Sequence, residues 1–501
     1  MRASIGRGMS DRRSDSDVAS AAQRAIRVSG AAIALLLVAR VASADEPMAP
    51  EPAKPQGPVL DVLGWEVSPI VEARVRGELR HEPTNDRVYG EQAVLLGDPV
   101  VAGAAPLGDQ FVLWERARLG LQVRKGILTT RVTLQDVRSV GDPSAYGRLA
   151  GQPDLPVTAP FEAFAELTSD DGDVDFTLGR QEIELGDGRL IGKSDDRAPG
   201  RSLDAARFIG KVGDFDLQAF AAMLVLPGTP TLSDEPDPGL APGAQLYALD
   251  GVYHFQPYLG FELTGLARVV RQPLVDAITP SDTFVGALRV FGDHRGVRYS
   301  VMGAFEGGRI AQRGDTETKT LLSGAVAGRV SWETTLPWHM TFGAQGAYAS
   351  GGGGTTDSPD VHTFDPILPD TTMHFGQSGF YGLSNLIEAG ADYSVRPMDE
   401  ITMRIGYRFA GLADANGRWV TSTLQPVGAS DTNTSQMLGH VLGFDFMSHP
   451  IPEMSVNASY AAMILGDGAK NAFVAAHPDG GAAAAPDVSH FAMLDVGVSI
   501  R

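Results

Sequence analysis

Arginine recurs at every second or fourth residue in several segments of this sequence. Its guanidinium group is a planar fork of donors that binds carboxylates through two hydrogen bonds, and rings of Arg inside a pore favour anions. The positions concerned, each on the polar side of its segment, are Arg74, Arg76, Arg116, Arg118, Arg131, Arg329, Arg404 and Arg408. We expect these side chains to line a water-filled space and to attract anionic solutes.

For each arginine taken alone, a structural role is about as well supported as a role in attracting anions. Glu72 and Glu78 alternate on the same side of their segment as Arg74 and Arg76, so these groups could pair and hold the shape of the protein. Because salt screens charges over about 8–10 Å, only clusters of unpaired Arg would create an anion path.

A second arginine-rich segment runs from Gly179 to Asp204 and alternates Gly, Arg and acidic residues. Its arginines are Arg180, Arg189, Arg197 and Arg201. This composition favours a folded constriction over a long irregular loop. A loop whose charges satisfy one another is the alternative, and it is about equally favoured.

Sequence signals for catalysis are missing. There is no His-Glu-x-x-His, no phosphate-binding loop and no Gly-x-Ser-x-Gly, and the ten His are scattered. The chain has no Cys, which excludes disulfides, thiolate metal sites and cysteine nucleophiles. We therefore expect a protein that is not an enzyme and that needs no cofactor or metal.

The composition narrows the protein class further. Acidic residues outnumber basic ones 61 to 41 over 501 residues, and the net charge of −20 argues against a nucleic-acid partner. No apolar run approaches the ~18 residues that a transmembrane helix needs.

Polar and apolar residues alternate with a period of two in most of the chain. From Ile401 to Phe409, Thr402, Arg404 and Arg408 fall on one side, and apolar residues fall on the other. A helix would place apolar residues at i, i+3 and i+4, so these segments are predicted to be strands.

Eighteen such segments are expected. They span 68–80, 111–124, 127–138, 161–169, 173–183, 203–210, 214–225, 244–255, 260–270, 283–291, 295–306, 319–332, 338–350, 386–395, 400–409, 439–447, 453–463 and 490–501. Eight short and nine long connections alternate between them. This sorting of loop length is typical of outer-membrane barrels, so we predict an all-β, transmembrane, antiparallel, up-and-down β-barrel with short periplasmic turns and long extracellular loops.

The residues before the predicted barrel have the pattern of an export signal followed by a linker. A basic stretch, a short apolar core and Ala42-Ser43-Ala44 predict a secretory signal peptide over residues 1–44. Residues 45–66 are expected to form a Pro-rich periplasmic linker, and residues 67–501 the barrel. Aromatic residues near predicted strand ends (Trp332, Trp338, Phe342, Tyr407, Phe409, Tyr460 and Phe491) suggest girdles at the membrane interfaces.

One motif in the segment from Gly179 to Asp204 resembles the alginate-export family of outer-membrane barrels. It consists of Gly179-Arg180-Gln181, then Gly186-Asp187-Gly188-Arg189-Leu190-Ile191-Gly192, and then Gly200-Arg201-Ser202. The resemblance implies an 18-stranded barrel with an Arg-rich constriction that passes an anionic polysaccharide or a related solute. It also implies that Arg180, Arg189, Arg197 and Arg201 belong to the constriction, with Asp204 as their counter-ion, and that periplasmic export proteins are partners.

Three functions remain open at this point. The first is a passive, anion-selective outer-membrane channel, with an acidic exopolysaccharide as a candidate cargo. The second is a general or uptake porin without a polysaccharide role, and the third is a secreted all-β glycan-binding protein. In the first two cases the expected surroundings are outer-membrane lipid and lipopolysaccharide.

Overall fold

The computed structural model describes residues 59–81, 110–141, 157–196, 200–224, 244–270, 281–310, 319–352, 360–422, 424, 426–430, 432–476 and 485–500. The chain divides into two units, Met1–Ala49 and Pro50–Arg501, and all described residues belong to the second. The expected signal peptide and most of the expected linker therefore lie outside the described residues.

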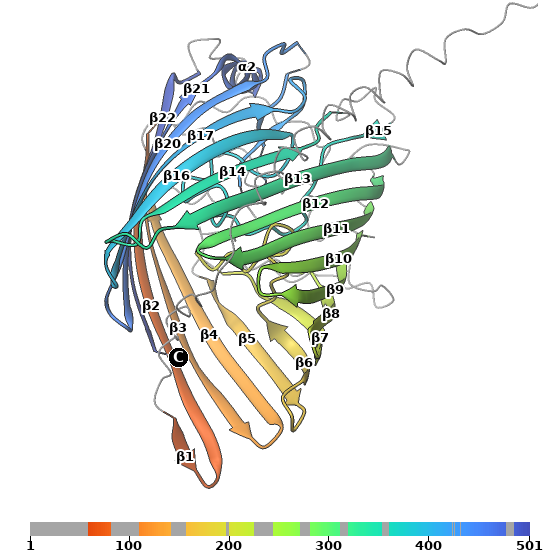
Figure 1. Ribbon diagram of the computed structural model, residues 1–501, viewed down its shortest axis with the longest axis vertical. Helices are drawn as coiled ribbons and strands as arrows, with labels where there is room; N and C mark the ends of the chain where they lie inside the picture. The colour runs from red at the N-terminus through yellow and green to blue at the C-terminus, as the bar shows by residue number, and fades with distance from the viewer. Residues whose placement is uncertain are drawn as a thin grey trace, which may run out of the picture. The chain divides into compact units, whose positions relative to one another are not determined.

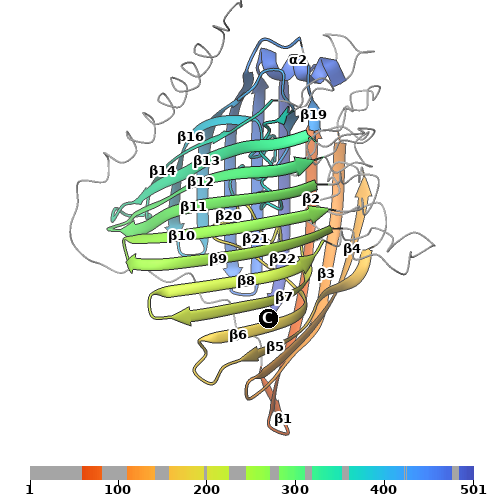
Figure 2. The ribbon, with the colours of Figure 1, turned by 90° about the vertical axis from the view of Figure 1, so that its right-hand side faces the viewer.

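The described part of the second unit is built almost entirely from long antiparallel strands (Figures 1 and 2). They are β2 (Trp65–His81), β3 (Gln110–Lys125), β4 (Leu128–Gly141), β5 (Val157–Thr168), β6 (Val174–Gln181), β7 (Leu203–Val212), β8 (Phe215–Met223), β9 (Ala244–Gln256), β10 (Leu259–Val270), β11 (Ser281–His294), β12 (Val297–Ile310), β13 (Lys319–Glu333), β14 (Thr341–Ala349), β16 (Leu386–Met398), β17 (Ile401–Leu412), β20 (Met437–Ile451), β21 (Met454–Leu465) and β22 (Val488–Ile500).

These eighteen strands form a closed barrel within the described residues. Each pairs with the next along the chain, and β22 returns to pair with β2 from Val71–Ile500 to His81–His490. Closure leaves no unpaired edge, which is the condition under which a sheet can cross hydrocarbon. The predicted strands are confirmed, with differences of a few residues at their ends.

The two ends of the barrel differ, as the loop lengths predict. At the turn end, connections such as 126–127 and 452–453 are short, whereas at the loop end 182–202 and 350–385 are long. Minor elements extend both ends: β1 (Leu60–Val62) pairs with the start of β2, and β15 (Asp360–Val361) pairs with β13. At the loop end, β18 (Trp419–Val420) pairs with β19 (Pro426–Gly428), and α2 (Asp467–Ala476) packs near them.

Alternation sorts the side chains to the two faces of the wall. On β3, Arg116 and Arg118 are 3 % and 1 % exposed inside the barrel, whereas Leu119 and Leu121 are exposed on the outside. This outer apolar surface is what a lipid-facing wall requires. Most expected girdle aromatics are exposed there too, but Phe491 is a correction: it is 1 % exposed and lies inside, with the Arg80 guanidinium 4.7 Å from its ring.

The interior is not polar all round. From β7 to β13 the inner face carries many small and aliphatic side chains, including Leu246, Ala248, Leu266, Val285 and Ala304, which join one buried cluster. On this side of the barrel both faces of the wall are apolar, and the inner face is covered by chain from the loop end.

Candidate pore constriction

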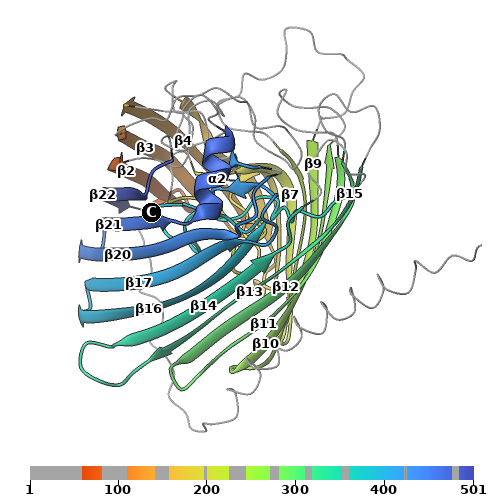
Figure 3. The ribbon, with the colours of Figure 1, turned by 90° about the horizontal axis from the view of Figure 1, so that it is seen from above.

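Two long connections from the loop end fold into the barrel. We call residues 182–202, between β6 and β7, loop A, and residues 362–385, between β15 and β16, loop B. Seen from above, segments of these loops lie within the ring of strands (Figure 3). Most of their described side chains are buried or half-buried.

The two loops are joined by backbone hydrogen bonds. Gly192 N donates to Leu368 O at 2.9 Å, and Leu368 N donates to Leu190 O at 3.0 Å, next to a parallel bridge between Ile191 and Leu368. Residue 192 must be glycine for this approach, because a Cβ there would lie 2.6 Å from Asp370 N. Loops A and B therefore form one partition inside the barrel.

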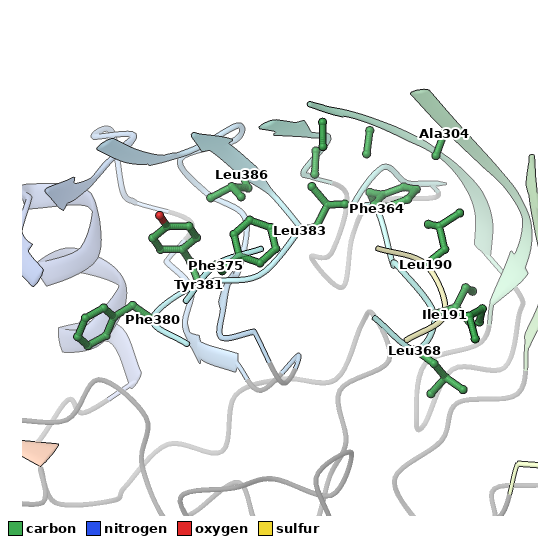
Figure 4. Packing of buried hydrophobic residues seen from close by; sticks show 14 of the residues in the cluster. Leu190, Ile191, Ala304, Phe364, Leu368, Phe375, Phe380, Tyr381, Leu383 and Leu386 are labelled. Atoms are coloured by element: carbon green, nitrogen blue, oxygen red, sulfur yellow. The ribbon is translucent and has the colours of Figure 1, made fainter. Parts of the chain in front are cut away.

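Apolar packing fixes the partition to one side of the wall. Leu190 and Ile191 of loop A and Phe364 and Leu368 of loop B belong to the same buried cluster as Ala304 of β12 (Figure 4). Burial of each such aliphatic or aromatic side chain contributes about 1.5–3 kcal/mol. The partition is thus a packed part of the protein core.

Arginines of the opposite wall hold loop A at Asp195. The Asp195 carboxylate accepts hydrogen bonds from Arg116 at 3.0 Å and pairs with Arg118 at 2.8 Å, while its carbonyl accepts one from Arg74 at 2.9 Å. Glu72 lies on the same wall and pairs with both Arg116 and Arg118. Three of the predicted pore-lining residues therefore anchor a loop.

Arginines also hold loop B. Arg76 pairs with Asp495 of β22 and donates to Gln377 of loop B at 3.4 Å. On the side of the barrel formed by β7 to β13, Arg268 of β10 pairs with Asp365 of loop B at 2.6 Å. Each loop is thus tied to the wall by buried charge-assisted contacts as well as by apolar packing.

Four other arginines face one small cavity. Arg189 of loop A, Arg329 of β13, and Arg404 and Arg408 of β17 line a cavity of about 50 Å³, together with Gln345, His374 and Glu388. The set brings together one predicted residue from the loop motif and three from the two strands β13 and β17.

Carboxylates pair with each of these guanidinium groups. Arg329 pairs with Asp392 at 2.5 Å, Arg404 with Asp445 at 2.9 Å, Arg408 with Glu388 at 3.7 Å and Arg189 with Asp187 at 3.0 Å. Arg329 and Arg404 remain 33 % and 31 % exposed. These pairs hold the guanidinium forks in place while leaving part of two of them open to a solute.

The remaining predicted residues lie elsewhere. Arg131 pairs with Glu162 at 3.2 Å, and Arg180 pairs with Asp204 at 3.1 Å. Arg201 is buried and donates to backbone carbonyls of both loops. Arg197 lies outside the described residues.

A second cavity is lined by loop A together with β5, β6 and β7. It measures about 330 Å³ and is lined by Glu162, Glu166, Glu182 and Glu184, with Lys193 and Arg207. Burial, and then the nearby Asp195 carboxylate, raise the pKa of Glu182 to about 7. Loop A therefore contributes both to an arginine-lined cavity and to one in which carboxylates are in the majority.

His374 of loop B lies between the partition and the arginine-lined cavity. Its Nε2 is 2.7 Å from the Asp187 carbonyl oxygen, and burial together with the nearby Arg189 charge lowers its pKa to about 4. His374 is therefore neutral near pH 7, and the positive charge at this cavity comes from arginine.

No group of His, Asp and Glu in the described residues has the arrangement of a metal site. Among the same residues, no helix has the length and apolar character to cross a membrane.

The sequence analysis did not predict that loop B belongs to the constriction. Its signal is the concentration of Phe364, Ile367, Leu368, Phe375 and Phe380 in a segment predicted to be an extracellular loop. Such residues need an apolar surface to cover, and the inner face of β7–β13 provides it.

Comparison with known proteins gives a family and a fold. Residues 272–482 match the model of the family described as Alginate export, which confirms the resemblance over that part of the chain, although the motif of loop A lies outside it. No curated protein matches.

Similar folds occur in solved outer-membrane porins. Acinetobacter baumannii OccAB1 superposes with a TM-score of 0.53 at 10% identity, covering 87% of this chain and 97% of that one. A BenF-like porin from Pseudomonas fluorescens Pf-5 gives 0.53 at 9% identity, with 87% and 98% covered, and Pseudomonas aeruginosa OccK11 gives 0.51 at 10%, with 86% and 96% covered. The chain thus has the fold of an outer-membrane porin.

Proposed function

We propose that this porin-like barrel, part of which matches the alginate-export family, is a passive outer-membrane channel that prefers anionic solutes and carries an acidic exopolysaccharide such as alginate. The observation that carries the proposal is the convergence of Arg189, Arg329, Arg404 and Arg408 on one cavity between the partition and the wall.

The geometry suits a solute that carries carboxylates. The partly exposed forks of Arg329 and Arg404 offer pairs of donors at a spacing that a carboxylate can bridge. Their own carboxylate partners limit the strength of binding, and a solute that is held weakly at several sites can also leave. The chain has no nucleotide-binding motif, so flux follows a gradient or is driven by partner proteins.

The orientation and surroundings follow from the fold. The signal peptide would direct the chain through the secretory pathway, with the turn end then in the periplasm and the loop end outside. The apolar outer wall would contact lipid and lipopolysaccharide, and periplasmic export proteins would deliver the polymer.

Reconstitution in planar bilayers tests anion selectivity. With a KCl gradient, the reversal potential is expected to have the sign of chloride preference, and oligomers of uronic acid are expected to block the current at concentrations at which neutral oligomers of equal length do not. A cation-preferring current would contradict the proposal.

An uptake porin for small solutes is the second candidate. It is favoured by the packed partition, which leaves only about 50 Å³ at the arginine-lined cavity, a size suited to part of a small solute. Conductance block separates the two: a porin of this kind is blocked equally by monomeric and polymeric uronates. The closed barrel with its apolar outer surface does not fit a secreted glycan-binding protein.

A further inference from the structure

Among the described residues, Arg201 contacts both loops of the partition and pairs with no carboxylate. It is 8 % exposed at the end of loop A, and its Nη1 lies 2.8 Å from Gly192 O, 2.5 Å from Leu368 O and 3.1 Å from Pro369 O. The first carbonyl belongs to loop A and the other two belong to loop B. One guanidinium group therefore holds the two loops at their point of contact.

Further hydrogen bonds between loop A and loop B surround this point of contact, and we call the whole set the joint. Ser194 N donates to the Asp370 carboxylate at 3.2 Å, and Ser194 Oγ lies 3.3 Å from Thr371 Oγ1. Asp370 N donates in turn to Gly188 O at 2.8 Å. Arg189, which follows Gly188, reaches the arginine-lined cavity from this joint.

We propose that Arg201 is a positioning residue, which ties loop A to loop B and thereby sets the width of the passage without touching the solute. The inference rests on the proposed channel function but does not depend on its anion preference. Burial lowers the pKa of Arg201 to about 10, so the group stays charged at physiological pH and donates strongly to the three carbonyls.

Loss of the tie would remove the charged donor from three buried carbonyls, although Leu368 O keeps the bond from Gly192 N and Pro369 O keeps the one from Ser194 Oγ. Water would replace the guanidinium group, and the contact between loop A and loop B beside Arg201 would loosen, with the remaining backbone bonds between the loops exposed to that water. Apolar packing would still hold Leu190 and Ile191 near the wall, so the barrel itself is expected to remain folded.

The test compares Arg201→Met with Arg201→Lys in the full-length exported protein. We expect Arg201→Met to raise single-channel conductance severalfold and to admit larger neutral sugars in liposome swelling, and we expect Arg201→Lys to lie between it and the wild type. Arg298→Met is the matched control, since Arg298 is half exposed at the turn end and pairs with Asp293.

A reversible cross-link gives a second measurement. The side-chain oxygens of Ser194 and Thr371 lie 3.3 Å apart, which makes this pair the choice for an engineered disulfide, and the chain has no Cys of its own. In the Arg201→Met background, the oxidised Ser194→Cys/Thr371→Cys protein should conduct like the wild type, and reduction should raise the conductance. If Arg201→Met alone does not fold, the oxidised form is refolded and then reduced in the bilayer.

The proposal is overturned if Arg201→Met keeps the wild-type conductance and sugar cutoff, or if reduction of the cross-link leaves the current unchanged. A wild-type channel that prefers cations would contradict the proposed function instead, and the comparison with neutral sugars would still decide the role of Arg201.

Discussion

Replacement of Arg329 by Gln should lower the net charge at the arginine-lined cavity by one unit. Arg329 is one-third exposed, and both oxygens of the Asp392 carboxylate lie 2.5 Å from its Nη2. The substitution removes one positive charge and leaves Asp392 without this partner. The double variant Arg329→Gln/Asp392→Asn keeps the same change in side-chain size at residue 329, so it separates the effect of charge from the effect of volume.

The size of the effect follows from Coulomb's law. Two unit charges about 4 Å apart interact by about 1 kcal/mol with water-like screening and by about 4 kcal/mol at an effective dielectric constant of 20. Removal of the guanidinium charge makes the interaction free energy of a passing anion less favourable by this amount and that of a passing cation more favourable by the same amount. At the lower figure the ratio of chloride to potassium permeability falls roughly 30-fold.

The assay is the reversal potential of single channels in about 0.1 M KCl, where the Debye length is about 10 Å; the shift should shrink in 1 M KCl, where it is about 3 Å. The matched control is Arg329→Gln/Asp392→Asn, which removes both charges and should return the permeability ratio to near the wild-type value. The reasoning is refuted if Arg329→Gln leaves the reversal potential unchanged, or if the double variant behaves like the single one.

Three further outcomes are expected. Asp195→Asn weakens two charge-assisted contacts, to Arg116 and Arg118. Each contributes about 1.5–3 kcal/mol when fully buried and less here, because Asp195 is 32 % exposed. The temperature at which the folded band is lost on a gel should therefore fall, and an unchanged temperature would contradict the role of Asp195 in holding loop A. His374, with its pKa lowered to about 4, should contribute no change in selectivity from pH 8 to 5 and should add anion preference near pH 4. Because the unfolded chain binds this proton near pH 6.5, stability should fall as pH drops from about 6.5 to 4, and His374→Gln should remove both effects, which titrations of reversal potential and melting temperature would check. Glu182, with its pKa raised to about 7, should ionise between pH 6 and 8 and lower the chloride-to-potassium ratio; the same slope in Glu182→Gln would argue against it.

The wall of the barrel could be predicted because its physics is local. Each strand must offer lipid one apolar face, so the alternation from Ile401 to Phe409 is enough to identify β17. The short β1–β2 hairpin was missed, since its turn places Leu63 at φ 57° before Gly64, and Leu is not a residue that turn patterns favour there.

The interior could be predicted only in part, because it depends on contacts between distant segments. Alternation places Arg116 inside the barrel, but only the three-dimensional structure shows that Asp195, 79 residues away, occupies it. The same limit applies to Arg201, whose partners at Leu368 and Pro369 belong to a loop that the sequence gives no reason to place beside it.

The most direct test of the central claim is the sign of the reversal potential of the purified wild-type protein in a planar bilayer under a KCl gradient. A potential displaced toward the chloride equilibrium value is the expected result. A potential displaced toward the potassium value, or a correctly folded barrel that passes no ions, would contradict an anion-selective channel.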